Sequence, residues 1–285
     1  MISIENNHIQ YESFKALHYN NTPLLLPNIW DPLGALLIQD MGFSAIATSS
    51  SALALSEGYT DGQMIPFEEL ILRLKSIVRG SKLPVSADIE NGFANNDLEL
   101  VDHIKSLLEI GIVGINYEDS NKPENQLISI KIQQERIKLI KDTAQAMNHK
   151  IFINARIDTY VHGEHLSHEA KLNETIQRAM AYKEAGADCI FPILLTDQQH
   201  IQTLNETLNI PINIMTFPGT PSLKTLKVIG IARISVGGSL MKLALQNIKD
   251  FCLNFKELNK LETLFSTGIN SEYLNQLVMQ NSNKK

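Results

Sequence analysis

The sequence predicts a single (β/α)₈ barrel, in which eight parallel strands form a closed ring surrounded by helices. Short apolar runs alternate along the chain with longer segments of helical spacing, and eight such pairs can be counted. The apolar runs carry polar residues only at their ends, as is typical of strands that are buried on both faces. The length of 285 residues also fits one barrel, because α/β barrels of about 250 residues commonly fold as one domain.

The predicted strands are rich in isoleucine and valine. In chain order they are residues 24–27, 45–48, 85–89, 114–117, 151–156, 189–192, 212–215 and 233–236. Between them, segments 67–78 and 97–110 place apolar side chains along one helical face. Glycine follows several predicted helices, at Gly42, Gly80, Gly111 and Gly186, where it can supply the left-handed residue that ends a helix.

The C-terminal segment 240–285 is too long for one last barrel helix, and it predicts two or three further helices. No linker, low-complexity run or repeat separates this segment from the barrel. We therefore expect one domain over residues 1–285 that ends in a helical extension.

The composition excludes several classes of protein. The formal net charge is −6 and the basic residues are scattered, which argues against a nucleic-acid binder. Residues 1–7 lack the features of a signal peptide, and no run approaches the roughly 20 apolar residues of a membrane span. Cys189 and Cys252 lie too far apart to suggest a disulfide framework, so we expect a cytoplasmic protein without a membrane or nucleic-acid partner.

Polar side chains follow the predicted strands at the end where barrel active sites are built. Asp88 and Glu90 follow the third strand, Glu118 the fourth and Arg156 the fifth, while Asp61 lies on the loop after the second. Carboxylates gathered at one mouth repel one another unless a cation compensates them. Ligands that are all oxygen favour Mg²⁺, with Mn²⁺ as the alternative ion.

Each residue also has a structural interpretation. A strand-end carboxylate can cap the next helix, as we expect Asp97 to do, and Arg156 can pair with Glu118 instead of a substrate carboxylate. The run from Ser49 to Ser51 can form a plain turn, or it can let backbone amides approach an anionic ligand.

Several segments resemble the isocitrate lyase/phosphoenolpyruvate mutase superfamily. The run Asp88-Ile89-Glu90-Asn91-Gly92-Phe93 resembles its Asp-x-Asp-x-Gly-Tyr metal signature, with Glu in the second acidic place. The other matching segments are 27–31, 42–50, 58–63, 114–119, 154–158, 185–188 and 235–238, so the match covers roughly residues 23–240.

The resemblance implies a role for each matching residue. Asp88 would bind Mg²⁺ directly, and Asp61, Glu90 and Glu118 would bind it through water. Ser49 and Ser50 would hold the carboxylate of a small 2-oxo acid, Arg156 would contact the substrate or leaving group, and Asn125 would stand in for a gating-loop asparagine. The resemblance also implies a homotetramer, a dimer of dimers, in which C-terminal helices are swapped between subunits.

Two departures from the family pattern affect the expected reaction. The lyases carry a Lys-Lys/Arg-Cys-Gly-His loop after the fourth strand, where this chain has Ser120-Asn121-Lys122-Pro123-Glu124-Asn125. Methylisocitrate-cleaving members have Glu after the Phe-Pro of the sixth strand, where this chain has Ile193. We expect enolate chemistry with C–C cleavage or decarboxylation. The alternatives are a C–P bond enzyme, of phosphoenolpyruvate phosphomutase or phosphonopyruvate hydrolase type, and a non-catalytic metal- and keto-acid-binding relic.

Three other motifs carry alternative interpretations. A Schiff-base aldolase needs a strand-end lysine, but Lys82 and Lys150 precede their strands. Residues 235–239 could form a phosphate cradle, or their glycines could only allow close packing. His162, His165 and His168 could bind Zn²⁺, although a solvated loop is the preferred interpretation.

Overall fold

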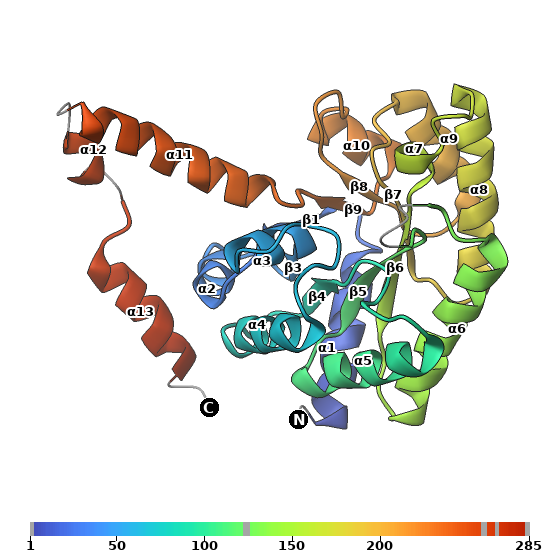
Figure 1. Ribbon diagram of the computed structural model, residues 1–285, viewed down its shortest axis with the longest axis horizontal. Coiled ribbons are helices and arrows are strands. Elements are labelled where there is room, and N and C mark those ends of the chain that lie inside the picture. Colours follow the sequence, from blue (N-terminus) through green and yellow to red (C-terminus); the bar gives the residue numbers. More distant parts are fainter. Residues whose placement is uncertain (1–2, 122–125, 258–260, 266–267, 283–285) are drawn as a thin grey trace.

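The computed structural model describes residues 3–121, 126–257, 261–265 and 268–282, and it confirms the predicted barrel (Figure 1). All described strand pairs are parallel, in the sheet orders β2-β3-β4-β5-β6-β7 and β1-β9-β8. The two sheets form one ring, because only Pro27 separates β1 from β2 and a parallel bridge joins Ile190 to Ile212. The strands are β1 (Leu24–Leu26), β2 (Asn28–Ile29), β3 (Ile46–Thr48), β4 (Val85–Asp88), β5 (Gly114–Glu118), β6 (Phe152–Ile157), β7 (Cys189–Pro192), β8 (Asn213–Met215) and β9 (Arg233–Ser235).

Helices surround the ring and bury their apolar faces against it. They are α2 (Pro32–Asp40), α3 (Ser50–Ser56), α4 (Phe67–Arg79), α5 (Asp97–Ile110), α6 (Ile130–Ala146), α7 (Thr159–His162), α8 (His168–Glu184), α9 (Gln198–Leu208) and α10 (Leu223–Ile229). The predicted segments 67–78 and 97–110 are therefore helices, and leucine and isoleucine side chains of α4 and α5 are buried as their spacing indicated. The helices cover the outside of the ring, so the carboxyl ends of the strands remain available for polar side chains.

Two expectations about helix ends are wrong. Asp97 is the first residue of α5, and Asn96 caps the helix instead by accepting the Glu99 amide at 3.0 Å. Gly80 ends α4 with a φ of −76°, in the right-handed region. A Cβ there would lie 2.9 Å from the Pro32 side chain, so this glycine allows close packing of α4 on α2. Gly111 has the predicted left-handed φ, 99°.

Helix α1 (Ile4–Leu17), which the sequence pattern did not predict, covers the amino-terminal end of the barrel. Phe14 is fully buried and packs edge-on against Phe152 with ring centroids 5.1 Å apart. A Cβ at Gly114 would lie 2.8 Å from the Phe14 ring. The glycine at the start of β5 therefore makes room for the aromatic side chain that closes this end.

The buried His18 ring follows α1 and gives a pH-dependent contribution to stability. Burial, reinforced by the charge of Arg233, lowers the pKa of His18 to about 3, against roughly 6.5 in an unfolded chain. The folded state therefore binds fewer protons between these values. The contribution of neutral His18 is fully present above pH 6.5 and is lost as the pH falls toward 3.

We expect this contribution to fall by about 2 kcal/mol between pH 7.5 and pH 5. The measurement is urea unfolding of wild type and His18→Gln at both pH values. The wild type should lose more free energy of unfolding on acidification than the variant does. His165→Gln removes an exposed histidine and should keep the wild-type slope, whereas equal slopes in wild type and His18→Gln would contradict the assignment.

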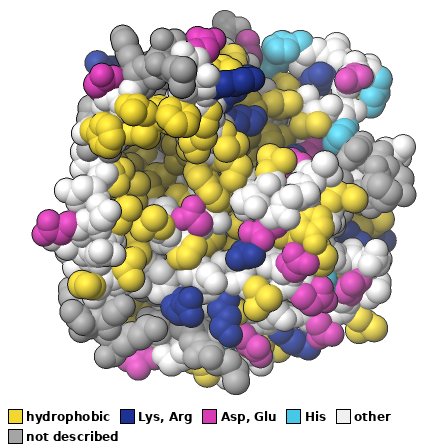
Figure 2. Space-filling model, turned by 60° about the vertical axis from the view of Figure 1, so that its left-hand side comes forward, with side chains coloured by type: hydrophobic (Ala, Val, Ile, Leu, Met, Phe, Trp, Pro, Cys, Tyr) yellow, Lys and Arg dark blue, Asp and Glu magenta, His cyan; other side chains and the backbone are white. Residues whose placement is uncertain are grey.

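The C-terminal segment comprises α11 (Ser239–Lys256), α12 (Glu262–Phe265) and α13 (Ser271–Ser282). Helix α11 projects away from the barrel, and α13 returns alongside α2, where Tyr273 Oη donates to Asp40 Oδ2 at 2.7 Å (Figure 1). Leu243, Ile248 and Phe255 of α11 are each more than half exposed. Figure 2 shows hydrophobic side chains around a hollow on this side of the molecule. No helix in the described part of the chain has the length and apolarity to cross a bilayer.

Candidate active site at the carboxyl ends of the strands

Strands β4, β5 and β6 place the predicted polar residues in the barrel interior. Asp88 is aligned with Asn116, and Glu118 is aligned with Arg156. Side chains two residues apart along a strand face the same side, so Asn116 and Glu118 share the interior face. The register therefore brings acidic residues and one arginine to the same end of the ring.

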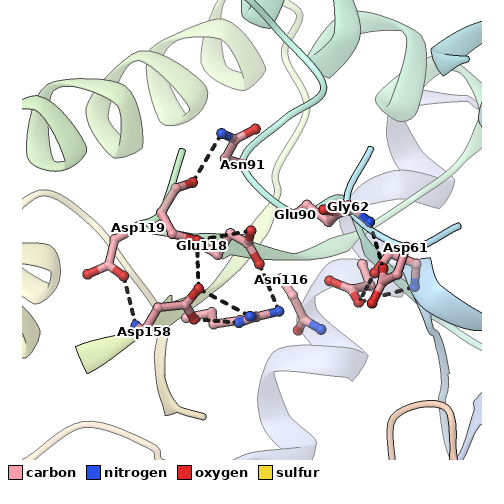
Figure 3. Close-up of polar contacts among 12 residues, drawn as sticks. Asp61, Gly62, Glu90, Asn91, Asn116, Glu118, Asp119 and Asp158 are labelled. Carbon is pink, nitrogen blue, oxygen red and sulfur yellow. Dashed lines mark hydrogen bonds and ion pairs between the residues drawn. The ribbon is translucent and has the colours of Figure 1, made fainter. Parts of the chain in front are cut away.

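Arg156 contacts two buried carboxylates, those of Glu118 and Asp158; both carboxylate residues are labelled in Figure 3. Its Nη1 lies 2.7 Å from Glu118 Oε2, and its Nε and Nη2 donate to the two oxygens of Asp158 at 2.6 and 3.1 Å. Burial alone would lower the pKa of Arg156, but the carboxylates of Glu118, Asp158 and Asp88 outweigh it and hold the pKa above its ordinary value. The pairing of Arg156 with Glu118, left open by the sequence, is present.

Asp158 was not among the site residues predicted from the sequence. It is fully buried, its Oδ2 accepts the Ser120 hydroxyl at 2.6 Å, and its amide donates to Asp119 Oδ1 at 2.8 Å. Strand alternation could have found Asp158, because it comes two residues after Arg156, at the end of β6.

Asp119 supports Asp158 from outside the ring of strand ends. Its Oδ2 accepts from Arg178 at 3.0 Å and from Tyr182 at 2.7 Å. Burial raises the pKa of Asp119 to about 6, with Asp158 adding to the rise and Arg178 opposing it. Asp158, Asp119 and Arg178 therefore form a connected chain of buried polar contacts that fixes the guanidinium of Arg156.

Asp88 is held by the start of α3. Its Oδ2 accepts from the Ser50 hydroxyl at 2.8 Å and from the Ser50 amide at 3.1 Å, and no described residue donates to Oδ1. Ser49 caps α3 by accepting the Ala52 amide at 3.3 Å. The serine run is thus a helix start, and it binds one oxygen of Asp88 while the other has no donor among the described residues.

Glu90 is buried close to other negatively charged side chains, and its pKa is raised as a result. It is 4% exposed, and its Oε1 accepts the Gln63 amide at 2.9 Å. Burial raises the pKa of Glu90 to about 8, with the charges of Glu118, Asp88 and Asp61 contributing to the rise. Carboxylates brought together for a cation are expected to hold a proton in this way until the ion binds and displaces it.

Asp61 lies exposed on the loop after α3, where its Oδ1 accepts the Gly62 amide at 3.0 Å. Figure 3 places Asp61 and Glu90 on the side of the site away from Asp158. Asp61, Glu90, Asp88 and Glu118 offer only oxygen donors, the type that a hard divalent ion such as Mg²⁺ prefers, but no three of them bring ligand atoms within 4.8 Å of one another. Asn125 lies outside the described residues.

Two alternative sites lose support from the geometry. The amides of Val236 and Gly237 donate to Asn28 Oδ1 at 3.0 and 2.9 Å, so the predicted phosphate cradle has two of its donors engaged within the protein. Lys150 forms an ion pair with Glu12 of α1, at the amino-terminal end of the barrel. That position is the wrong end for a Schiff-base lysine.

A second buried arginine lies below the site. Arg233 is fully buried, and its Nη2 donates to Asn116 Oδ1 at 3.1 Å; the same oxygen accepts from Asn154 Nδ2 at 2.8 Å. Burial lowers the pKa of Arg233 to about 10. Sequence reasoning missed this group, because only the closed ring brings β9 beside β5 in the interior.

Known lyases, decarboxylases and mutases are similar to this chain in sequence. The family model for phosphoenolpyruvate phosphomutase matches residues 14–255. The chain is 32% identical to 2-methylisocitrate lyase of Bacillus subtilis (strain 168), over 70% of this chain and 65% of that protein. It is 24% identical to oxaloacetate decarboxylase 2 of Pseudomonas fluorescens (strain Pf0-1), over 82% of this chain and 79% of that protein.

Solved structures show the same architecture. A crystal structure described as a candidate lyase/mutase of Burkholderia cenocepacia J2315 superposes with a TM-score of 0.86 and 29% identity, covering 95% of this chain and 96% of that one. Phosphonopyruvate hydrolase in complex with oxalate and Mg²⁺ superposes with a TM-score of 0.82 and 18% identity, covering 96% of each chain. The latter identity supports the fold alone.

Proposed function

Because the chain belongs to the phosphoenolpyruvate phosphomutase family, within the isocitrate lyase/phosphoenolpyruvate mutase superfamily of lyases and mutases, we propose that it is a Mg²⁺-dependent C–C lyase or decarboxylase. Its substrate is a small 2-oxo acid or a precursor that yields one. The observation that carries the proposal is the concentration of negative charge at the strand ends: burial and the charges of Glu118, Asp88 and Asp61 raise the pKa of Glu90 to about 8.

In the proposed site, Asp88 would hold the ion directly, while Asp61, Glu90 and Glu118 would hold it through water. A bound Mg²⁺ supplies positive charge to the enolate oxygen that develops when a bond to C3 breaks. Ser49 would hold the substrate carboxylate at the start of α3, whereas Ser50, expected from the sequence to do the same, has its hydroxyl and amide both donating to Asp88 and would instead fix that carboxylate in place. Arg156, fixed by Glu118 and Asp158, orients the leaving part of the substrate.

The opposite side of the mouth supports C–C chemistry over C–P chemistry. Phe191 is aligned with Arg156 in the sheet, and both Phe191 and Ile193 are buried. The strand ends 191–193, 215–217 and 235–238 contain no charged residue. A transferred phosphoryl group needs cations or free amides around its oxygens, and here Arg156 already contacts two carboxylates.

The experiment is an assay of purified protein with Mg²⁺ and a panel of 2-oxo and 2-hydroxy diacids, with phosphonopyruvate included. We expect release of pyruvate or another 2-oxo acid, and loss of that release in excess EDTA with recovery on adding Mg²⁺. Equal turnover in EDTA would contradict the metal assignment, and turnover of phosphonopyruvate alone would favour the C–P enzyme. Binding of oxalate with no turnover of any compound would favour the non-catalytic relic.

The exposed apolar residues of α11 support a proposed assembly. Leu243, Ile248 and Phe255 lie on a helix that leaves its own barrel, and exposed apolar area of this kind marks an interface. We propose that a second copy of the chain covers α11, with C-terminal helices swapped in a dimer of dimers, as the family resemblance implies.

A further inference from the structure

A cluster of potential metal ligands lies outside the site described above, where the first turns of α8 and α9 meet. His168 and Glu169 begin α8, Asp197 caps α9, and His200 lies in the first turn of α9. One ligand atom from each of His168, Asp197 and His200 lies within 4.8 Å of the others. The histidine-rich loop noted in the sequence contributes only His168 to this group, whereas Asp197 and His200 come from the start of α9.

Each histidine of the cluster lies close to one carboxylate. His168 Nε2 lies 3.8 Å from Asp197 Oδ2, and His200 Nε2 lies 3.7 Å from Glu169 Oε1. The two imidazole rings lie one over the other, with centroids 3.9 Å apart. Two neutral imidazoles and two carboxylates would balance the charge of a divalent ion, and the carboxylates also offset the positive ends of the two helices.

The hydroxyl of Tyr160 orients the His200 ring so that its other nitrogen can bind a metal ion. His200 is 5% exposed, and its Nδ1 lies 3.1 Å from the hydroxyl of Tyr160. When Nδ1–H donates to the Tyr160 oxygen, Nε2 carries its lone pair toward the cluster. A metal-bound histidine commonly has its other ring nitrogen fixed in this way. Tyr160 belongs to α7, which directly follows the strand of Arg156 and Asp158.

We propose that His168, Asp197 and His200, with Glu169 as the fourth ligand, bind Zn²⁺. Nitrogen ligands select zinc over magnesium, so this site differs in chemistry from the all-oxygen mouth. A tetrahedral zinc site places its ligand atoms about 3.4 Å apart. His168 and Glu169 reach that spacing by turning, because both side chains are more than half exposed. The ion would fix α8 to α9 and, through Tyr160, to α7.

The test is calorimetric titration of the whole protein with Zn²⁺ in the presence of excess Mg²⁺. We expect one Zn²⁺ per chain in the wild type and affinity reduced at least about tenfold in His168→Ala. His165→Ala, which removes a neighbouring exposed histidine, should bind Zn²⁺ as the wild type does. Asp88→Asn should also retain Zn²⁺ binding, which separates this site from the mouth.

Two further readouts distinguish ligation from a general effect. Co²⁺ should give a visible absorption spectrum of four-coordinate type in the wild type and in His165→Ala, and this spectrum should disappear in His168→Ala. Zn²⁺ should raise the melting temperature of the wild type and of His165→Ala but not that of His168→Ala. Equal Zn²⁺ affinity in His168→Ala and wild type, or absence of Zn²⁺ binding in the wild type, would overturn the proposal.

Discussion

Asp88→Asn is expected to lower kcat/KM by about 10³-fold or more, because it removes the one carboxylate proposed to bind Mg²⁺ directly. The Ser50 hydroxyl and amide that now donate to Asp88 Oδ2 can still bond to the asparagine oxygen, so the local fold should persist. The measurement combines steady-state kinetics with Mg²⁺ titration by calorimetry. Both activity and ion affinity should fall together.

Two other carboxylate variants serve as comparisons for the kinetic effect of Asp88→Asn. Asp61→Asn changes an exposed residue proposed to act through water and should cost about 10- to 100-fold. Asp97→Asn changes an exposed carboxylate 3.6 Å from Arg136 on the barrel's outer surface and should leave the kinetics unchanged. Wild-type Mg²⁺ affinity in Asp88→Asn would refute the assignment of this residue as the direct ligand.

Asp158→Asn is expected to lower kcat/KM by about 10²- to 10³-fold while leaving Mg²⁺ affinity nearly unchanged. The NH₂ group of the asparagine cannot accept from Arg156, so the guanidinium loses one of its two contacts at 2.6 and 3.1 Å and is expected to turn toward Glu118. Removing one partner of a buried ion pair should also cost about 3–5 kcal/mol of unfolding free energy. Kinetics, Mg²⁺ titration and denaturation measure the three effects separately.

Glu57→Gln is the matched control for Asp158→Asn. It removes the carboxylate paired with Arg73 of α4, also an arginine–carboxylate contact but one without a link to Asp119, Asp158 or Arg156. We expect wild-type kcat/KM in this variant. If Asp158→Asn kept wild-type turnover once its folding was verified, or if it lost Mg²⁺ binding as Asp88→Asn does, Asp158 would not be a positioning residue for Arg156.

The strands and several of the surrounding helices could be predicted because their signals are local. A strand buried on both faces is an apolar run, so the sequence alone places the residues that end each run at the mouth. Helix ends were harder to predict: Asn96 and Asp97 are both good capping residues, and only the backbone decides between them. Gly80 was misjudged because its role depends on Pro32, 48 residues earlier in the chain.

The supporting residues of the site could not be predicted in the same way. The contact of Arg233 with Asn116 crosses the closed ring, and the meeting of His168 with His200 depends on how α8 packs on α9. Helix α1 was missed because its pattern is weak, with Asn7, Tyr11 and Phe14 buried among polar residues. Such contacts follow from tertiary packing, which a single sequence does not reveal.

The division of the barrel mouth into two unlike halves has a consequence for how this enzyme can change. Asp88, Glu118 and Arg156 come from β4 to β6, whereas uncharged side chains such as Phe191 and Met215 come from β7 and β8. We expect substitutions confined to the second half to alter which compounds are accepted without disturbing the proposed ion site. New specificities can therefore arise, in evolution or by design, through a few changes in the last three strands while the reactive half is inherited intact.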